Sequence, residues 1–327
     1  MKKIVLTGGT GFIGANLARR LLRDGHQVHL FVRKGCQNWR IDEIRKDIVL
    51  YELDFNDQVQ LEKTLKQVSP NWIFHLAAYG AYSVQDNLRQ MISTNILATV
   101  NLVEAALKIG FQAFINIGSS SEYGWKDYPP TETEWLDPNS HYALTKASST
   151  MFCRYTAIAR KANIITLRPY AVFGPYEDFG RFMPTLIVKA LDGYLPHLVN
   201  PRVARDFLYV DDFVEACILA ATHINQEPGS IYNCGTGIQT TIQEVVELAK
   251  RLLPIIDEPK WGSMENRIWD TQVWVSDTQR IQEVLGWRPR YNLEEGFKCM
   301  ISWFRDNPSF LKIYKNIISP ERIQQEA

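Results

Sequence analysis

The sequence is poor in the features that mark several common protein classes. Its 327 residues carry 36 basic and 36 acidic side chains, so no charge excess points to a nucleic acid or a membrane surface as partner. The cysteines are five, an odd number, and no two have a short metal-ligand spacing: Cys36, Cys153, Cys217, Cys234 and Cys299. This pattern argues against a disulfide framework or a metal site and predicts free thiols in a reducing compartment.

Long apolar runs are missing as well. No uninterrupted apolar stretch reaches the ~18 residues that a membrane span needs. The stretch Met1–Leu6 resembles a signal segment only superficially, because Gly8 and Gly9 end it too early. We therefore expect a cytoplasmic protein with no membrane partner. Hydrophobic residues make up 46% and charged residues 22% of the chain, an ordinary globular composition.

What the first half does contain is an alternation of short apolar runs and amphipathic stretches. The runs are short and rich in β-branched residues, which predicts strands at Ile4–Leu6, Val28–Val32, Ile48–Leu53, Trp72–Leu76, Phe114–Ile117 and Ile164–Leu167. Helical periodicity predicts helices over Gly14–Arg23, Gln58–Gln67, Leu88–Lys108 and Tyr142–Arg160. Repeated β-α units predict an α/β fold, a Rossmann-type doubly wound parallel sheet.

The rhythm changes after about residue 175, where proline and aromatic residues become frequent. Helical patterns continue between longer irregular segments, at Phe213–Thr222, Ile242–Leu253, Thr278–Leu285 and Leu293–Phe304. We predict a nucleotide-binding domain over residues 1–175 and a smaller, mostly α-helical substrate-binding part over residues 176–327. Some chain is expected to cross between the two, because no linker separates them.

A glycine-rich run, Thr7 to Gly14, follows the first strand and opens the first helix. In that context Gly8 allows a tight turn, Gly11 admits a pyrophosphate to the backbone, and Gly14 permits close packing of helix and strand. The helix N-terminus offers free amides and partial positive charge to the phosphates. The run therefore predicts a dinucleotide site at Thr7, Gly8, Thr10, Gly11, Phe12 and Ile13.

The residue that ends the second strand distinguishes NAD from NADP, because an acidic residue there binds the ribose 2′-hydroxyl of NAD. This chain has Arg33 and Lys34 instead. A guanidinium suits a 2′-phosphate, so NADP(H) is favoured and NAD(H) stays open. Asp54 and Phe55 follow the third strand, where they are expected beside the adenine. Asp54 is equally well placed as a helix N-cap.

Tyr142 and Lys146 are four residues apart in a predicted helix and so share one face. A tyrosine near its ordinary pKa of ~10 is a poor base at neutral pH. An ammonium beside the phenol lowers that pKa, and a tuned phenol exchanges a proton with a sugar hydroxyl or carbonyl. The pair predicts proton transfer coupled to redox chemistry.

Several motifs, in order, resemble the extended short-chain dehydrogenase/reductase family, the nucleotide-sugar epimerases, dehydratases and reductases. They are Thr7–Gly14, His75-Leu76-Ala77-Ala78, Asn95, Gly118–Gly124, Tyr142–Lys146, Leu167-Arg168-Pro169, Arg205-Asp206-Phe207 and Leu285-Gly286-Trp287. The resemblance covers nearly the whole chain and implies an NAD(P)-dependent oxidoreductase acting on a nucleotide sugar.

The resemblance also implies roles for individual residues. Ser119 would hydrogen-bond the reacting oxygen, with Ser120 as the alternative if the register is shifted by one. Tyr142 would be the acid/base, and Lys146 would hold the nicotinamide ribose. The cofactor would be flanked by Ala77, Ala78, Asn95, Pro169 and Tyr170. The substrate would meet Ser120 and Ser121, and its diphosphate would be clamped by Arg205 and Arg267.

Three reactions share this scaffold. The 4,6-dehydratases resemble this chain but carry a carboxylic acid at the position of Ser121. The neighbouring acid, Glu122, is one residue further along a predicted strand, so we expect its side chain to point to the opposite face unless a bulge intervenes. Most 4-epimerases use NAD and an acid ending the second strand, which is missing here. A 4-ketoreductase using NADPH fits Arg33, and the chain is more loosely similar to CDP-abequose and CDP-paratose synthases. We favour reduction of a nucleotide-linked 4-keto-6-deoxyhexose in deoxysugar biosynthesis, with the 4-epimerase as the alternative.

Two further expectations concern binding and assembly. Relatives that bind cofactor without turnover typically lose the serine, tyrosine or lysine, and all three are present here. A purely binding role is therefore the least favoured. By resemblance, the two long helices Leu88–Lys108 and Tyr142–Arg160 would pair across a two-fold axis in a homodimer. Ile96, Val100, Met151 and Ile158 would either serve that interface or face the sheet.

Overall fold

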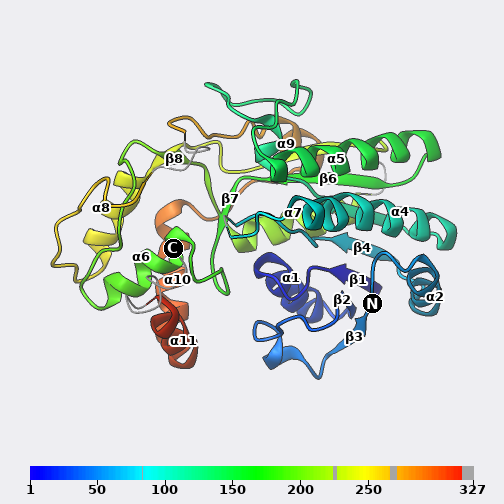
Figure 1. Ribbon diagram of the computed structural model, residues 1–327, viewed down its shortest axis with the longest axis horizontal. Coiled ribbons are helices and arrows are strands. Elements are labelled where there is room, and N and C mark those ends of the chain that lie inside the picture. Colours follow the sequence, from blue (N-terminus) through cyan, green and yellow to red (C-terminus); the bar gives the residue numbers. More distant parts are fainter. Residues whose placement is uncertain (83, 224–226, 266–270, 319–327) are drawn as a thin grey trace.

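A computed structural model describes residues 1–82, 84–223, 227–265 and 271–318 (Figure 1). Its centre is a seven-stranded parallel sheet with the strand order β10-β6-β5-β4-β1-β2-β3. The strands are β1 (Lys3–Thr7), β2 (Gln27–Val32), β3 (Ile48–Glu52), β4 (Trp72–His75), β5 (Ala113–Ile117), β6 (Ile164–Pro169) and β10 (Ile231–Cys234). The order reverses between β1 and β4, as in doubly wound nucleotide-binding sheets, so the predicted fold class is confirmed.

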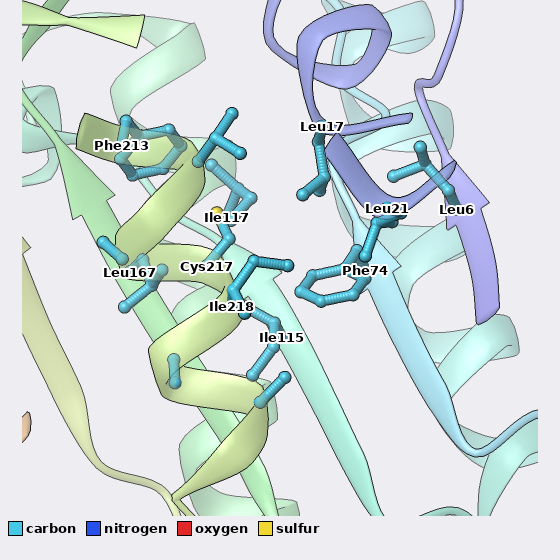
Figure 2. Packing of buried hydrophobic residues seen from close by; sticks show 14 of the residues in the cluster. Leu6, Leu17, Leu21, Phe74, Ile115, Ile117, Leu167, Phe213, Cys217 and Ile218 are labelled. Carbon is cyan, nitrogen blue, oxygen red and sulfur yellow. The ribbon is translucent and has the colours of Figure 1, made fainter. Parts of the chain in front are cut away.

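Helices cover both faces of this sheet. One face carries α1 (Phe12–Arg23), α7 (Val210–Thr222) and α9 (Gln279–Leu285), and the other carries α2 (Gln58–Val68), α4 (Ala98–Ile109) and α5 (His141–Arg160). Figure 2 shows the first face, where Leu17 and Leu21 of α1 and Cys217 of α7 meet strand residues such as Phe74 and Ile115. Burial on both sides explains why the strands are continuous apolar runs.

The C-terminal helical part has its own core beside the sheet, at the left of Figure 1. It contains α6 (Phe182–Leu191), α8 (Ile242–Leu252), α10 (Leu293–Asp306) and α11 (Pro308–Ile318). Two small sheets connect it to the large one, a parallel pair of β7 (Ala171–Phe173) with β9 (Phe207–Tyr209) and an antiparallel pair of β8 (Ala204–Arg205) with β11 (Thr240–Thr241). A short 3₁₀ turn spans Asp42–Ile44.

Some elements were not predicted from the sequence. Helices α6 and α11 were missed, as was β10, which pairs with β6 and closes the edge of the large sheet. Both β10 and α7 come from beyond residue 175 yet pack with the nucleotide-binding sheet. Chain therefore crosses between the two parts, and the boundary itself stays a prediction.

The predicted helix over 88–108 consists of α3 (Leu88–Met91), a π-helical stretch (Ile92–Leu97) and α4. By length and composition alone, Leu88–Ile109 is apolar enough to cross a membrane, although polar residues such as Asn95 and Asn101 interrupt it. Leu102, Val103 and Ala106 are nevertheless buried in the core shared with α2, α5 and the sheet. This stretch is therefore built into the fold as a covering helix.

Candidate active site

A cavity of about 1510 Å³ follows the carboxyl ends of the parallel strands and extends to the C-terminal helical part. This is the edge at which open α/β sheets bind their ligands. Most of the sequence-predicted site residues line it: Gly8, Thr10, Gly11, Phe12, Ile13, Arg33, Asp54, Phe55, Ala77, Ala78, Ser119, Ser120, Ser121, Tyr142, Lys146, Pro169, Tyr170 and Arg205. The fold thus brings together residues from eight separate segments of the chain.

The glycine-rich turn forms a bare backbone cradle at one end of the cavity. Gly8 has a φ of +70°, and a Cβ there would lie 2.6 Å from backbone atoms of Leu76 and Ala77. A Cβ on Gly14 would lie 2.2 Å from the carbonyl oxygen of Gly8, so Gly14 lets α1 close onto the turn itself rather than onto the strand. Gly11 is the N-cap of α1. The amides of the first turn and the lack of side chains fit a dinucleotide diphosphate.

The ends of β2 and β3 form the next part of the cavity wall. Arg33 follows β2, is exposed and lines the cavity. Asp54 follows β3, and its carboxylate accepts the backbone N–H of Asn56 at 2.9 Å. The N-cap of α2 is Asp57, which accepts the N–H of Gln60 at 2.9 Å. The interpretation of Asp54 as a helix cap is therefore wrong, because the N-cap lies three residues later, at Asp57.

Two predicted cofactor residues, Thr7 and Asn95, are absent from the lining of this cavity and hold its wall in place. The Thr7 hydroxyl accepts the N–H of Ala77 at 3.2 Å. The Asn95 side chain accepts the N–H of Tyr79 at 2.9 Å and donates to its carbonyl at 2.8 Å. It also donates to the hydroxyl of Thr145 on α5 at 2.9 Å. The polar groups of both side chains are committed to protein, so both hold the wall of the cavity, and their direct contact with a cofactor stays a prediction.

Ser119 sits on a turn braced by a buried carboxylate. It caps the 3₁₀ turn Ser120–Tyr123, and Glu122 completes the capping box. Glu122 is fully buried, and both of its carboxylate oxygens accept hydrogen bonds. Oε1 accepts a hydrogen bond from the Ser119 N–H at 2.8 Å and from the Thr150 hydroxyl at 2.9 Å. Oε2 accepts a hydrogen bond from Nε of Arg168 at 2.8 Å. The expectation that Ser121 and Glu122 lie on a strand is therefore wrong, because Ser119 caps a 3₁₀ turn that contains both residues. Glu122 does face away from the cavity, and no bulge brings it to the place of Ser121.

Tyr142 and Lys146 lie where the helix pattern puts them, on α5, whose N-cap Ser140 accepts the N–H of Ala143 at 3.2 Å. The Ser119 hydroxyl hydrogen-bonds the phenol of Tyr142. Lys146 is buried, and its Nζ donates to the carbonyl of Ile117 at the end of β5. The three residues predicted to be catalytic thus line the same cavity.

The electrostatics of this pair differ from the prediction. Burial raises the pKa of Tyr142, and this outweighs the hydrogen bond from Ser119 and the nearby charge of Arg181. Burial also lowers the pKa of Lys146. The expectation that Lys146 lowers the phenol's pKa is therefore wrong for this structure, because desolvation dominates both groups and the ammonium is directed at Ile117.

The predicted substrate residues Ser121 and Arg205 line the same cavity. The Ser121 hydroxyl is 2.7 Å from that of Ser119. Arg205 lies with its guanidinium carbon 5.5 Å from the ring centroid of Trp274 and donates to the Ala204 carbonyl at 2.7 Å. Arg267, the other predicted clamp residue, lies outside the described residues.

Sequence reasoning missed a group of charged and aromatic residues that also line the cavity. Arg40 pairs with Asp178 at 2.7 Å, and the Tyr82 hydroxyl donates to the same carboxylate. Arg181 lies over the ring of Tyr82 at 4.4 Å and donates to the Ala81 carbonyl at 3.0 Å. The loops carrying them have no periodicity. Only the concentration of Arg, Asp and Tyr after the predicted sixth strand could have signalled Asp178 and Arg181.

The chain is similar to several known proteins. Residues 4–235 match the profile of the NAD dependent epimerase/dehydratase family. The dTDP-glucose 4,6-dehydratase of Neisseria meningitidis is 27% identical, over 98% of this chain and 97% of that protein. The UDP-glucose 4-epimerase of Mycolicibacterium smegmatis is 30% identical, over 93% and 99%. Among solved structures, MoeE5 in complex with UDP-glucose and NAD has a TM-score of 0.82 and 28% identity, over 94% and 99%.

The profile spans more than two thirds of the chain, and the relatives are matched over nearly their whole lengths. The predicted resemblance is thereby confirmed at the level of the family. The chain belongs to the NAD dependent epimerase/dehydratase family, the extended short-chain dehydrogenase/reductase enzymes that act on nucleotide sugars.

Proposed function

We propose that this enzyme reduces the 4-keto group of a nucleotide-linked 4-keto-6-deoxyhexose with NADPH, in deoxysugar biosynthesis. The observation that carries the choice of coenzyme is the end of β2, where Arg33 lines the cavity in the place of an acid. A guanidinium offers paired donors to a 2′-phosphate, whereas the 2′-hydroxyl of NAD is better served by a carboxylate.

The state of the catalytic group supports the direction of the reaction. Because burial raises the pKa of Tyr142, the phenol carries its proton at neutral pH. Reduction of a ketone requires a proton donor at the oxygen, and Tyr142 fills that role while the Ser119 hydroxyl orients the same oxygen. Lys146 is anchored at the wall of the site by the hydrogen bond from its Nζ to the carbonyl of Ile117. When bound, NADPH supplies the hydride.

The position of Glu122 argues against a 4,6-dehydratase. Elimination of the 6-hydroxyl needs an acid at the sugar, and the carboxylate of Glu122 is buried against Arg168. Ser121, which lines the cavity in that place, is no such acid. The dehydratase in Neisseria meningitidis is therefore a relative whose chemistry we do not transfer to this chain.

The alternative is a nucleotide-sugar 4-epimerase using NAD. It is favoured by the 30% identity to a UDP-glucose 4-epimerase and by the NAD and UDP-glucose bound to MoeE5. A uridine nucleotide sugar is accordingly a candidate substrate beside the cytidine and thymidine ones. A non-catalytic cofactor-binding role is the least favoured, because Ser119, Tyr142 and Lys146 are all present at the cavity.

The deciding experiment follows coenzyme absorbance. Purified protein is incubated with NADPH and with UDP-, dTDP- or CDP-4-keto-6-deoxyglucose, and in parallel with NAD and UDP-glucose. We expect NADPH oxidation with a ketosugar and no formation of UDP-galactose. Interconversion of UDP-glucose and UDP-galactose without NADPH consumption would overturn the reductase in favour of the epimerase. Tyr142→Phe serves as the inactive control in both arms.

We also propose the arrangement of the whole enzyme. Residues 1–175 bind the coenzyme, and residues 176–327 bind the nucleotide sugar, with Arg205 and Arg267 at its diphosphate. The protein is a cytoplasmic homodimer that pairs the long helices. Met151 and Ile158 on α5 are 52% and 53% exposed, so they face away from the sheet and are free to serve this interface.

A further inference from the structure

Glu177 is a buried acid at the cavity that the proposed chemistry does not use. It follows β7, lines the cavity and is only 6% exposed. Its Oε2 is buried and has no hydrogen-bond partner within the part of the chain that the structure describes. Burying a carboxyl oxygen without a hydrogen-bond partner costs free energy, which indicates that a ligand completes the hydrogen bonding of Glu177.

The backbone around Glu177 is tied to the phosphate cradle. Asn16 on α1 donates to the Pro175 carbonyl at 2.9 Å and to the Phe12 carbonyl at 3.0 Å. Arg40 donates to the carbonyls of Tyr176 at 2.7 Å and of Thr10 at 3.5 Å. These bonds hold the two residues that precede the glutamate near the glycine-rich turn.

The charges facing Glu177 come from three parts of the fold. Asp178 is adjacent, but its carboxylate is matched by Arg40 and Tyr82. Arg181 at the start of α6 is near enough to favour ionisation of Glu177, and from α11 the hydroxyl of Tyr314 donates to its backbone carbonyl. Burial, aided by Asp178, nevertheless raises the pKa of Glu177 to about 8 against the opposing effects of Arg181, Gly174 and Arg40.

We propose that Glu177 is a further binding residue of this site, a neutral carboxylic acid that donates its proton in a hydrogen bond to the diphosphate of the bound dinucleotide. The inference rests on the proposed function in so far as it takes a dinucleotide as ligand. In the neutral state the acid adds a donor to the amides of the glycine-rich turn. In the ionised state it repels the phosphates, so coenzyme affinity falls as the pH rises.

A nucleotide sugar offers a diphosphate of the same chemistry, and the experiment separates the two sources. Dissociation constants for NADH and for UDP are measured by calorimetry at pH 7 and pH 9. The proteins are the wild type, Glu177→Gln and, as a matched control, Glu62→Gln on the surface. NADH is used because it lacks the 2′-phosphate, which itself titrates near ~6. No turnover is needed, so a failed reductase assay leaves this test intact.

For the wild type we expect NADH binding to weaken about tenfold between pH 7 and pH 9, because only the neutral fraction of Glu177 is competent. The amide of Glu177→Gln keeps a donor and never ionises, so its NADH binding should change by less than about twofold. Glu62→Gln should behave as the wild type. The inference is overturned if Glu177→Gln keeps the wild-type pH dependence, if the wild type shows none, or if UDP rather than NADH carries the effect.

Discussion

Replacing Glu122 by Gln tests whether its carboxylate is a structural group of the Ser119 turn. The side chain is 0% exposed, and that of its partner Arg168 is 1% exposed. An amide offers one acceptor oxygen where the carboxylate offers two, and three donors converge here, from Ser119, Thr150 and Arg168. The substitution also leaves the guanidinium buried without a counter-charge. Removing one partner of such a pair costs about 3–5 kcal/mol.

That cost converts into a measurable melting temperature. At an unfolding entropy of about 2.1 cal/mol/K per residue, 327 residues give about 0.7 kcal/mol/K. Glu122→Gln should therefore lower Tm by about 4–7 °C in differential scanning calorimetry. The matched control is Glu62→Gln, whose partner Lys108 is 57% exposed. An exposed pair of this kind is worth about 0–1 kcal/mol, so Tm should fall by no more than about 1.5 °C.

A double variant completes the test. Adding Arg168→Met to Glu122→Gln removes the uncompensated charge, and replacing both partners of a buried pair by neutral groups is often nearly neutral. The double variant should recover at least about half of the lost stability. Equal losses for Glu122→Gln and Glu62→Gln would refute the reasoning, and Glu122 would then be open again as a catalytic acid.

Four further outcomes are expected. Arg33→Ala should weaken the binding of NADPH about tenfold or more and leave the binding of NADH almost unchanged in fluorescence titrations, because only NADPH has a 2′-phosphate for the guanidinium. Equal effects on both coenzymes would exclude this role of Arg33. Tyr142→Phe should lower turnover at least about 10²-fold while NADPH still binds, and retained activity would exclude it as the acid. Glu177→Gln should flatten the fall of Tm with pH. In the folded protein the pKa of Glu177 is about 8, against an ordinary value of 4.5. Wild-type stability is therefore lost as the pH rises between these two values, by up to about 1.4 kcal/mol per pH unit. An unchanged dependence of Tm on pH in Glu177→Gln would contradict the burial argument. Met151→Glu should convert the proposed dimer to monomer in light scattering, whereas a monomeric wild type would refute the dimer.

The sheet was predictable because its signal is local. A run such as Ile4–Leu6 is apolar throughout, since both faces of the sheet are covered, and its length separates it from a buried helix. The glycine-rich turn was predictable for a related reason: Gly8 and Gly14 occupy positions where a Cβ would strike backbone. In both cases a short stretch of chain carries the whole constraint.

The missed features depend on contacts between distant segments. The strand β10 is four residues long, and only its pairing with β6 makes it part of the large sheet. Asn95 belongs to a motif that resembles a cofactor contact, but its side chain is used by Tyr79 and Thr145. The pKa of Tyr142 is set mainly by burial in the folded protein, so the spacing of Tyr142 and Lys146 could not predict the direction of its shift.

The choice among related reactions therefore rests on a few side chains rather than on overall similarity. This chain is 27% identical to a 4,6-dehydratase and 30% identical to a 4-epimerase, a difference too small to separate the two chemistries. What separates them is whether an acid reaches the sugar beside Ser119. Gly118 bears on that question, because a Cβ there would lie 2.6 Å from the Glu122 carboxylate. Because Gly118 has no Cβ, the carboxylate of Glu122 can be buried beside it, and the added methyl group of Gly118→Ala would clash with that carboxylate. If the acid is structural, that variant should be destabilised in the same way as Glu122→Gln.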